Sequence, residues 1–194
     1  MRKHLRLVAI ATVLVAALAF VVAASAGNAH LRNNVRPNPA FVDNGLTLTA
    51  TAAYAGLGNF DTLQNLSATA NPTAECVNPG TGEHRPAGQN PASATVTGST
   101  AVPAGDIKNG NVTISTTTTA PVSPIPGAPD CPNPNWVENI TGMAFTSATI
   151  TLFQDSNQNG TFEAGELVLT VSCTFSTPTS TGSVPASGYS CTVS

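Results

Sequence analysis

Charged and aromatic side chains are scarce in this sequence. Of its 194 residues, seven are Lys or Arg, ten are Asp or Glu, three are His and one is Trp. Apolar residues do not recur every three or four positions, which is the spacing of an amphipathic helix. The chain therefore does not read as a helical bundle. Its solvated faces must be built from the abundant Thr, Ser and Asn side chains instead of ion pairs.

The longest apolar run lies at the N-terminus and has the three regions of a secretory signal peptide. Arg2, Lys3 and Arg6 form a basic region, Leu7 to Val22 form an apolar stretch in which Thr12 is the one polar residue, and Ala24-Ser25-Ala26 is a small-x-small cleavage site. We predict that residues 1–26 are removed and that the remainder is secreted, with no membrane insertion afterwards. The alternative is that the run stays as an uncleaved anchor, because about 20 residues can just span a bilayer.

Loss of the signal peptide changes the charge balance. Four basic residues, Arg32, Arg36, Arg85 and Lys108, then stand against ten acidic ones, a net charge of about −6. The four are scattered along the sequence, whereas nucleic-acid binding requires clustered Lys and Arg. We therefore expect no nucleic-acid partner.

Four cysteines remain: Cys76, Cys131, Cys173 and Cys191. An even number in an exported chain predicts a disulfide framework. Three connectivities are possible, and we favour Cys76 with Cys131 and Cys173 with Cys191. The sequence supports the first pair because both cysteines run into an Asn-Pro turn. A metal site of Cys76 with His84 is the alternative, but it has no CxxC or paired His to support it.

Alternation of apolar residues with Thr or Ser predicts strand after strand. The expected fold class is all-β: a single β-sandwich of about seven or eight strands, with long Pro-rich loops and two disulfides. The expected strands are Leu46 to Ala52, Thr62 to Ala70, Ala92 to Gly98, Asn111 to Thr118, Met143 to Gln154, Leu167 to Phe175 and Tyr189 to Val193.

Proline content predicts where the strands are interrupted. Asn71 to Pro91 has four prolines and Thr116 to Asn135 has six, so both are expected to be loops or edge connections. Residues 27–45 are expected to form an N-terminal arm, flexible or adding an edge strand, and residues 46–194 to form the sandwich domain.

One motif has specific chemistry. Residues 155–166 match the calcium-loop template D-x-[DN]-x-[DN]-G followed by five residues and Glu. Oxygens of Asp155, Asn157 and Asn159 would converge on a hard cation, followed by the Thr161 carbonyl, Glu163 and Glu166. Gly160 permits the sharp turn. A metal-free turn built from Asp, Asn and Gly is the alternative.

The residues of this loop resemble the calcium loop of EF-hand and dockerin proteins. Both flanks, Ala148 to Phe153 and Leu167 to Cys173, read as strands and not as helices. The resemblance is therefore closer to EF-hand-like loops between strands of bacterial extracellular β-sandwich proteins, where Ca²⁺ stiffens a connection. It covers about 12 residues and implies no activity. Asn in place of Asp at two ligand positions predicts weak binding, in the range of about 10⁻⁴ to 10⁻³ M.

Evidence for catalysis is slight. His84 could pair with Glu75 or Glu83 to activate a serine, but no nucleophile motif accompanies it. Trp136 could stack on a sugar ring, although we favour packing beside Cys131. We expect a secreted, non-catalytic extracellular protein, structural or an interaction module, whose partner is another extracellular protein or a polysaccharide. The alternative is a carbohydrate-binding module or a hydrolase-accessory protein.

Overall fold

The computed structural model describes residues 28–86, 91–124 and 131–194. The signal peptide predicted for residues 1–26 lies outside these residues. Over half of the chain is strand, in two antiparallel sheets whose facing side chains form one core, so the predicted all-β sandwich is confirmed. Among the described residues, no helix is long and apolar enough to cross a membrane.

The described residues form eleven strands, more than the seven or eight expected. The first sheet holds β1 (His30–Leu31), β2 (Ala40–Asp43), β3 (Leu48–Ala55), β7 (Val112–Thr117) and β10 (Gly182–Val184). The second sheet holds β4 (Thr62–Val77), β5 (His84–Pro86), β6 (Ala94–Val102), β8 (Val137–Gln154), β9 (Leu167–Phe175) and β11 (Tyr189–Val193). The extra strands have two to four residues, too few to show an alternating pattern. Three single-turn 3₁₀ segments complete the elements: η1 (Ala104–Asp106), η2 (Ala164–Glu166) and η3 (Ala186–Gly188).

Period-two alternation places the apolar residues between the sheets. Tyr54 and Leu48 of β3 are fully buried, and they belong to one cluster with Leu66 of β4 and with Phe145 and Ile150 of β8. Seven of the 25 buried hydrophobic residues are alanine, and Leu, Ile, Met and aromatic side chains fill most of the remaining core. For residues 28–45 the structure fits the added-strand alternative and not the flexible one: they contribute β1 and β2, and both of these strands pair with β3.

Polar residues face outward along the same strands and bond across them. The hydroxyl of Thr49 lies 2.8 Å from that of Thr117, and the hydroxyl of Thr51 lies 3.0 Å from that of Ser115. Cross-strand Thr pairs of this kind stabilise a sheet by a few tenths of a kcal/mol to about 1 kcal/mol each. The outer faces are thus built from hydroxyl groups, as the composition predicted.

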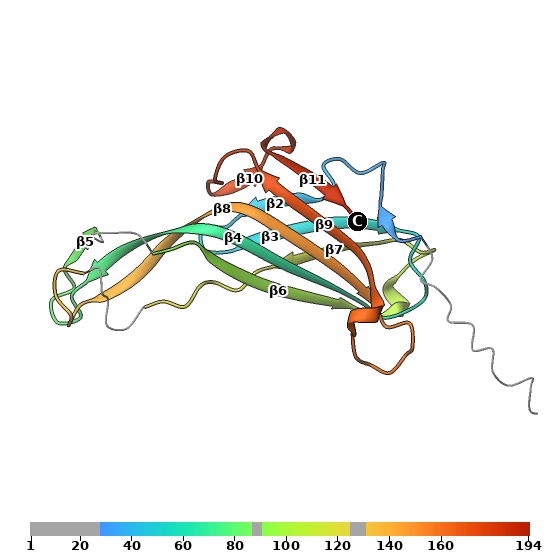
Figure 1. The fold of residues 1–194 in the computed structure, drawn as a ribbon, viewed down its shortest axis with the longest axis horizontal. Helices are drawn as coiled ribbons and strands as arrows, with labels where there is room; N and C mark the ends of the chain where they lie inside the picture. The colour runs from blue at the N-terminus through green and yellow to red at the C-terminus, as the bar shows by residue number, and fades with distance from the viewer. Residues whose placement is uncertain (1–27, 87–90, 125–130) are drawn as a thin grey trace, which may run out of the picture.

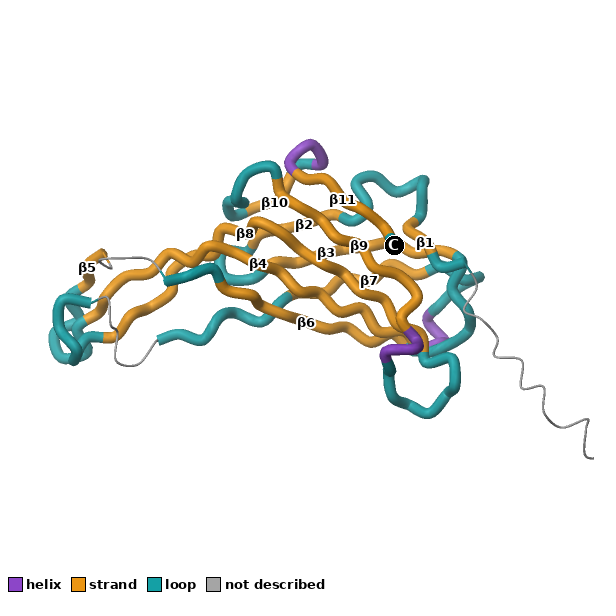
Figure 2. Tube along the Cα trace, viewed as in Figure 1, coloured by secondary structure: helices purple, strands orange, loops and turns teal. Residues whose placement is uncertain are grey.

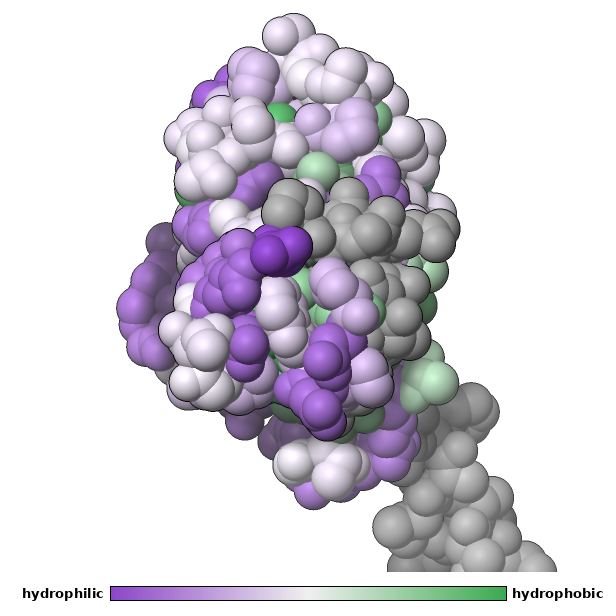
Figure 3. All heavy atoms as spheres, turned by 90° about the vertical axis from the view of Figure 1, so that its left-hand side faces the viewer, coloured by the Kyte–Doolittle hydropathy of each residue, from purple (hydrophilic) through white to green (hydrophobic). Residues whose placement is uncertain are grey.

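Two strands extend well beyond the sandwich. β4 and β8 remain paired from Thr62 with Gln154 out to Val77 with Val137, and β5 adds a short third strand at the tip (Figures 1 and 2). We call residues 70–86 and 131–146 the arm; it is separate from the N-terminal segment 27–45. Hydrophilic side chains gather at its end (Figure 3), among them the pairs His84–Glu75 and Arg85–Glu83.

The arm contradicts the prediction that a loop begins at Asn71. β4 continues through Pro72, which pairs with Met143 between two register shifts, at Thr69/Ala70 and at Thr73/Ala74. Proline lacks an N–H donor and is tolerated in a sheet where the ladder is already irregular. Its partner strand β8 is longer than predicted as well. It begins at Val137, which pairs with Val77, and not at the predicted Met143.

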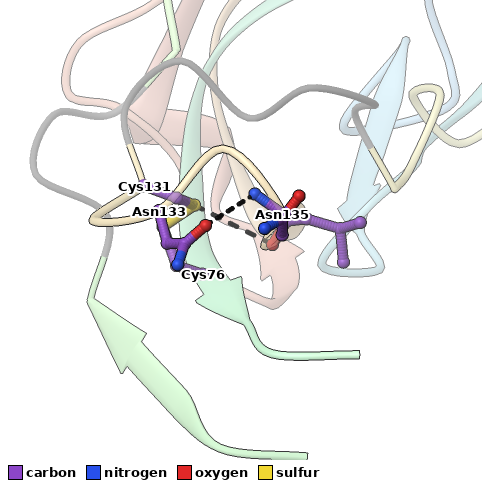
Figure 4. Close-up of a disulfide and its surroundings, with 5 residues drawn as sticks. Cys76, Cys131, Asn133 and Asn135 are labelled. Carbon is purple, nitrogen blue, oxygen red and sulfur yellow. Dashed lines mark hydrogen bonds between the residues drawn. A yellow bond between two sulfur atoms is a disulfide. The ribbon is translucent and has the colours of Figure 1, made fainter. Parts of the chain in front are cut away.

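Both favoured disulfides are present. Cys76 and Cys131 join with their Cα atoms 5.6 Å apart and tie the tip of β4 to the segment that precedes β8 (Figure 4). Beside this bond, the backbone N–H of Asn135 donates to the Asn133 side chain at 2.9 Å, which closes the Asn-Pro turn. Cys173 and Cys191 are register partners on β9 and β11. The two bonds indicate an oxidising compartment.

Candidate calcium-binding loop

The 155–166 loop connects β8 to β9 at the end of the sandwich opposite the arm (Figure 1). Asp155 directly follows Gln154, the last residue of β8, and its N–H donates to the Asp61 carbonyl at 2.9 Å. At the other end, η2 leads straight into β9. The two flanking strands pair from Ser147 with Thr174 to Phe153 with Leu167, so they fix both ends of the loop.

Asp155 organises the first half of the loop. Its side chain is only 5% exposed, and its two oxygens accept N–H groups of Asn159 at 3.0 Å and Gly160 at 2.8 Å. The chain curls around the carboxylate through left-handed backbone at Gln158 (φ 57°) and Gly160 (φ 78°). Glycine adopts this conformation without steric cost, which explains the residue at the sixth position.

The two asparagines continue the same pattern. The Asn157 side-chain oxygen accepts the N–H of Asn159 at 2.9 Å. The Asn159 side-chain oxygen accepts the N–H and the hydroxyl of Thr161, at 2.8 and 2.6 Å. The Asn159 amide nitrogen donates to Glu163 at 3.1 Å. Each side chain therefore bends the backbone that follows it, as Asx turns do.

Glu166 closes the loop. Its side chain is 6% exposed, and it accepts the N–H of Asn157 at 3.2 Å and the Ser156 hydroxyl at 3.3 Å through one oxygen. Its other oxygen accepts the Glu163 N–H at 3.3 Å, one half of a capping box around η2. Glu166 therefore joins the last position of the loop to the second and third positions.

All six residues predicted as calcium ligands thus belong to one hydrogen-bonded loop. Its donor set combines carboxylates with amide oxygens. Across the described residues, no three or more His, Cys, Asp or Glu side chains gather as a metal-holding group. Among the described residues, the acidic side chains paired with a basic one are Glu75 and Glu83 of the arm, and not Asp155 or Glu166. The loop keeps two buried carboxylates without a basic side chain to compensate their charge.

Trp136 lies in the arm, directly before the first residue of β8. It is half-buried, and the Arg85 guanidinium lies over the indole ring, 5.9 Å from its centroid. A cation over the ring occupies a surface that a sugar would need. Sugar stacking on Trp136 stays a prediction.

His84 bonds to Glu75, one of the two partners that the sequence suggested. Its Nδ1 atom lies 2.9 Å from the carboxylate, on the exposed arm. The hydrogen bonds found for the described residues give His84 no serine partner. The alternative metal site of Cys76 with His84 is excluded, because Cys76 is bonded to Cys131.

Sequence reasoning missed a second feature at the N-terminal edge of the fold. His30, Arg32 and Arg36 line one groove, although the basic residues look scattered in the sequence. The available signal was their close spacing within residues 30–36, in a chain with so few cations.

No protein-family model matches this chain, and neither the characterised proteins nor the solved structures that we searched contain a match.

Proposed function

We propose that this chain is an exported, non-catalytic β-sandwich protein that acts outside the cell as a structural or interaction module, with Ca²⁺ held by the 155–166 loop. The two disulfides support the exported location, because such bonds persist in oxidising compartments. The exposed position of His84 in the arm, bonded to Glu75, supports a role without catalysis.

The observation that carries the calcium proposal is the burial of Asp155 and Glu166 in the same loop. Buried carboxylates are costly unless they are paired, hydrogen-bonded or bound to a metal. Their hydrogen bonds satisfy part of this requirement and leave two buried carboxylates in one loop without a basic partner. A divalent cation would compensate both. The side-chain oxygen of Asn157 accepts one hydrogen bond and keeps a lone pair for such an ion, whereas the Asn159 oxygen would have to release a bond to Thr161.

A structural ion suits the position of the loop. Asp61, which accepts the Asp155 N–H through its carbonyl, also accepts the Ala104 N–H through its side chain at 2.8 Å. The loop is therefore tied to the connections that precede β4 and follow β6. Calcium bound here would stiffen the whole end of the sandwich.

Thermal unfolding with and without Ca²⁺ tests the proposal. A site with a Kd of about 10⁻⁴ to 10⁻³ M should contribute about 1.4 to 2.7 kcal/mol at about 10 mM Ca²⁺. For a domain of this size, that corresponds to a Tm increase of about 3 to 10 °C. Mg²⁺ at the same concentration should give less, because its smaller octahedral shell fits such a loop poorly.

The variant Asp155→Asn with Glu166→Gln should lose the calcium-dependent increase, whatever its Tm in chelator. Glu75→Gln with Glu83→Gln is the matched control, since it removes two carboxylates from the arm, and it should keep the increase. Equal Tm values in Ca²⁺ and chelator for the wild-type protein would refute the calcium site.

A further inference from the structure

A basic groove runs along the N-terminal edge of the sandwich. It has a volume of about 450 Å³ and is lined by residues of β1 and the following loop together with Val193 of β11. Figure 2 shows β1 near the C-terminus. His30, Arg32 and Arg36 line it, together with the amides of Asn33 and Asn38. A second hollow of about 340 Å³ shares His30, Arg32 and Asn33 and adds Asn34 and Asn111. The two hollows form one extended surface, which we call the basic groove.

Among the described residues, positive charge is concentrated in the basic groove. Residues 27–194 contain four Lys or Arg residues, and two of them line the groove. No acidic side chain lines either hollow. Arg85, by contrast, forms an ion pair with Glu83 at 2.7 Å, while the ion pairs of the described residues include neither Arg32 nor Arg36. Physiological salt screens charges beyond about 8 Å, so this patch acts locally despite the acidic balance of the chain.

The loop that carries the arginines is held from both sheets. The Asn38 amide donates to the carbonyls of Ala53 at 2.8 Å and Arg32 at 3.1 Å, and its oxygen accepts the Ala53 N–H at 3.0 Å. From the second sheet, the Tyr189 hydroxyl donates to the Pro39 carbonyl at 2.6 Å. Tyr189 is itself fixed by edge-on contacts with Phe41 and Phe175. The backbone of the groove is therefore preorganised, which lowers the entropic cost of binding.

We propose that the basic groove binds an acidic polysaccharide through its carboxylate groups. Guanidinium groups bind carboxylates through two parallel hydrogen bonds. The Asn33 and Asn34 amides offer donors and acceptors for sugar hydroxyls, and Asn111 offers its side-chain oxygen as an acceptor, because its amide nitrogen donates to the Asn109 and Lys108 carbonyls. The lining has no Phe, Tyr or Trp ring, the larger surfaces on which nucleobases stack, which favours a glycan over a nucleic acid. This inference rests on the proposed role as an interaction module and supplies its partner class.

Binding of polygalacturonate by the exported, oxidised protein tests the inference. The measurements are made in EDTA and about 50 mM salt, because Ca²⁺ gels this polymer and the 155–166 loop must not contribute. Wild-type protein should bind polygalacturonate and not neutral dextran. Arg32→Gln with Arg36→Gln should weaken binding at least about tenfold, since two charged contacts are lost. Arg32→Lys with Arg36→Lys should fall between, because the charge remains and the two-pronged geometry is lost.

Arg85→Gln is the matched control, an arginine outside the groove, and it should bind like the wild-type protein. Unchanged Tm values for every variant show that the fold is intact. The inference is overturned if wild-type protein does not bind polygalacturonate, if dextran binds equally well, or if the double Gln variant keeps its affinity. Tighter binding of poly(U) RNA than of polygalacturonate would assign the groove to nucleic acid. None of these outcomes depends on the calcium result, so the two proposals fail separately.

Discussion

Gly98 of β6 lies against the backbone of Thr117 of β7, so closely that a Cβ atom at position 98 would be 2.1 Å from the Thr117 carbonyl oxygen. The two strands belong to different sheets. Around this contact, the Thr119 N–H donates to the Thr97 carbonyl at 2.8 Å, and the Thr100 hydroxyl donates to the Ser115 carbonyl at 3.1 Å. Gly98 therefore allows the two sheets to meet along one edge of the sandwich.

Gly98→Ala should destabilise the protein, because the added methyl group meets rigid backbone and must push β6 away from β7. Overpacking of this kind costs about 1 to 3 kcal/mol, and loss of the Thr119–Thr97 bond adds to it. Denaturant unfolding measures the effect. Gly105→Ala is the control, since nothing lies within 4 Å of a Cβ atom there. Equal loss of stability in both variants would contradict the close contact.

The two disulfides should differ in what they protect. Cys173–Cys191 joins opposed residues of the paired strands β9 and β11, and Cys173 belongs to the core. Replacement of both cysteines by Ser should therefore lower the Tm of the whole sandwich. Chain entropy alone gives about 3 kcal/mol for its 18-residue separation. Replacement of Cys76 and Cys131 by Ser removes a larger loop closure, about 4 kcal/mol for 55 residues, at the far end of the arm.

Hydrogen exchange distinguishes these two effects. In the Cys76 and Cys131 variant, amides of β5 and of the arm portions of β4 and β8 should exchange faster, while β9 and β11 keep their protection. Uniformly faster exchange across both sheets would show that the arm and the sandwich unfold as one unit, against this expectation.

Stability should fall at alkaline pH because of Tyr54. Burial raises the pKa of its phenol above the ordinary value of 10.0, and its hydroxyl donates to the buried Gln64 oxygen at 2.6 Å. The unfolded chain ionises near pH 10 and the folded chain only at higher pH. The stability that Tyr54 contributes is therefore fully present below pH 10. Above pH 10 the free energy of unfolding declines, by at most about 1.4 kcal/mol per pH unit for one group. Burial raises the pKa of Tyr189 as well, so it adds to the decline.

Tyr54→Phe should be less stable than wild type at pH 7 by about 1 to 3 kcal/mol, because Gln64 loses a donor. It should also show a shallower decline above pH 10, with the contribution of Tyr189 remaining. Tm values from pH 7 to pH 11 measure both effects. A decline as steep as that of the wild-type protein would mean that Tyr54 is not responsible.

Local alternation was enough to predict several elements. β9 and β11 have the predicted bounds, and the favoured cysteine pairing followed from the proximity of those two strands and from the repeated Asn-Pro turns. The 155–166 segment was also predicted as a connection between two strands, and the structure shows it as a hydrogen-bonded loop between β8 and β9; calcium binding there stays a prediction. Features fixed by neighbouring residues are therefore readable in this chain.

Features fixed by partners distant in sequence were not readable. Pro72 reads as the end of a strand, and only its pairing with Met143 between two irregularities of the β8 ladder shows why β4 continues. The basic groove depends on Val193 and on Tyr189, which holds Pro39 from 150 residues away. Gly98 gives no signal either, because its role is set by Thr117 of the other sheet.

The hydroxyl-covered outer faces have a consequence for the environments that the protein tolerates. Thr and Ser side chains carry no charge between strongly acidic and strongly alkaline pH, so pairs such as Thr49 with Thr117 and Thr69 with Thr95 neither titrate nor weaken by ionic screening. A surface held by ion pairs would loosen in brine or acid. This one should keep its cross-strand bonds and its hydration in seawater, soil acid or dilute buffer alike.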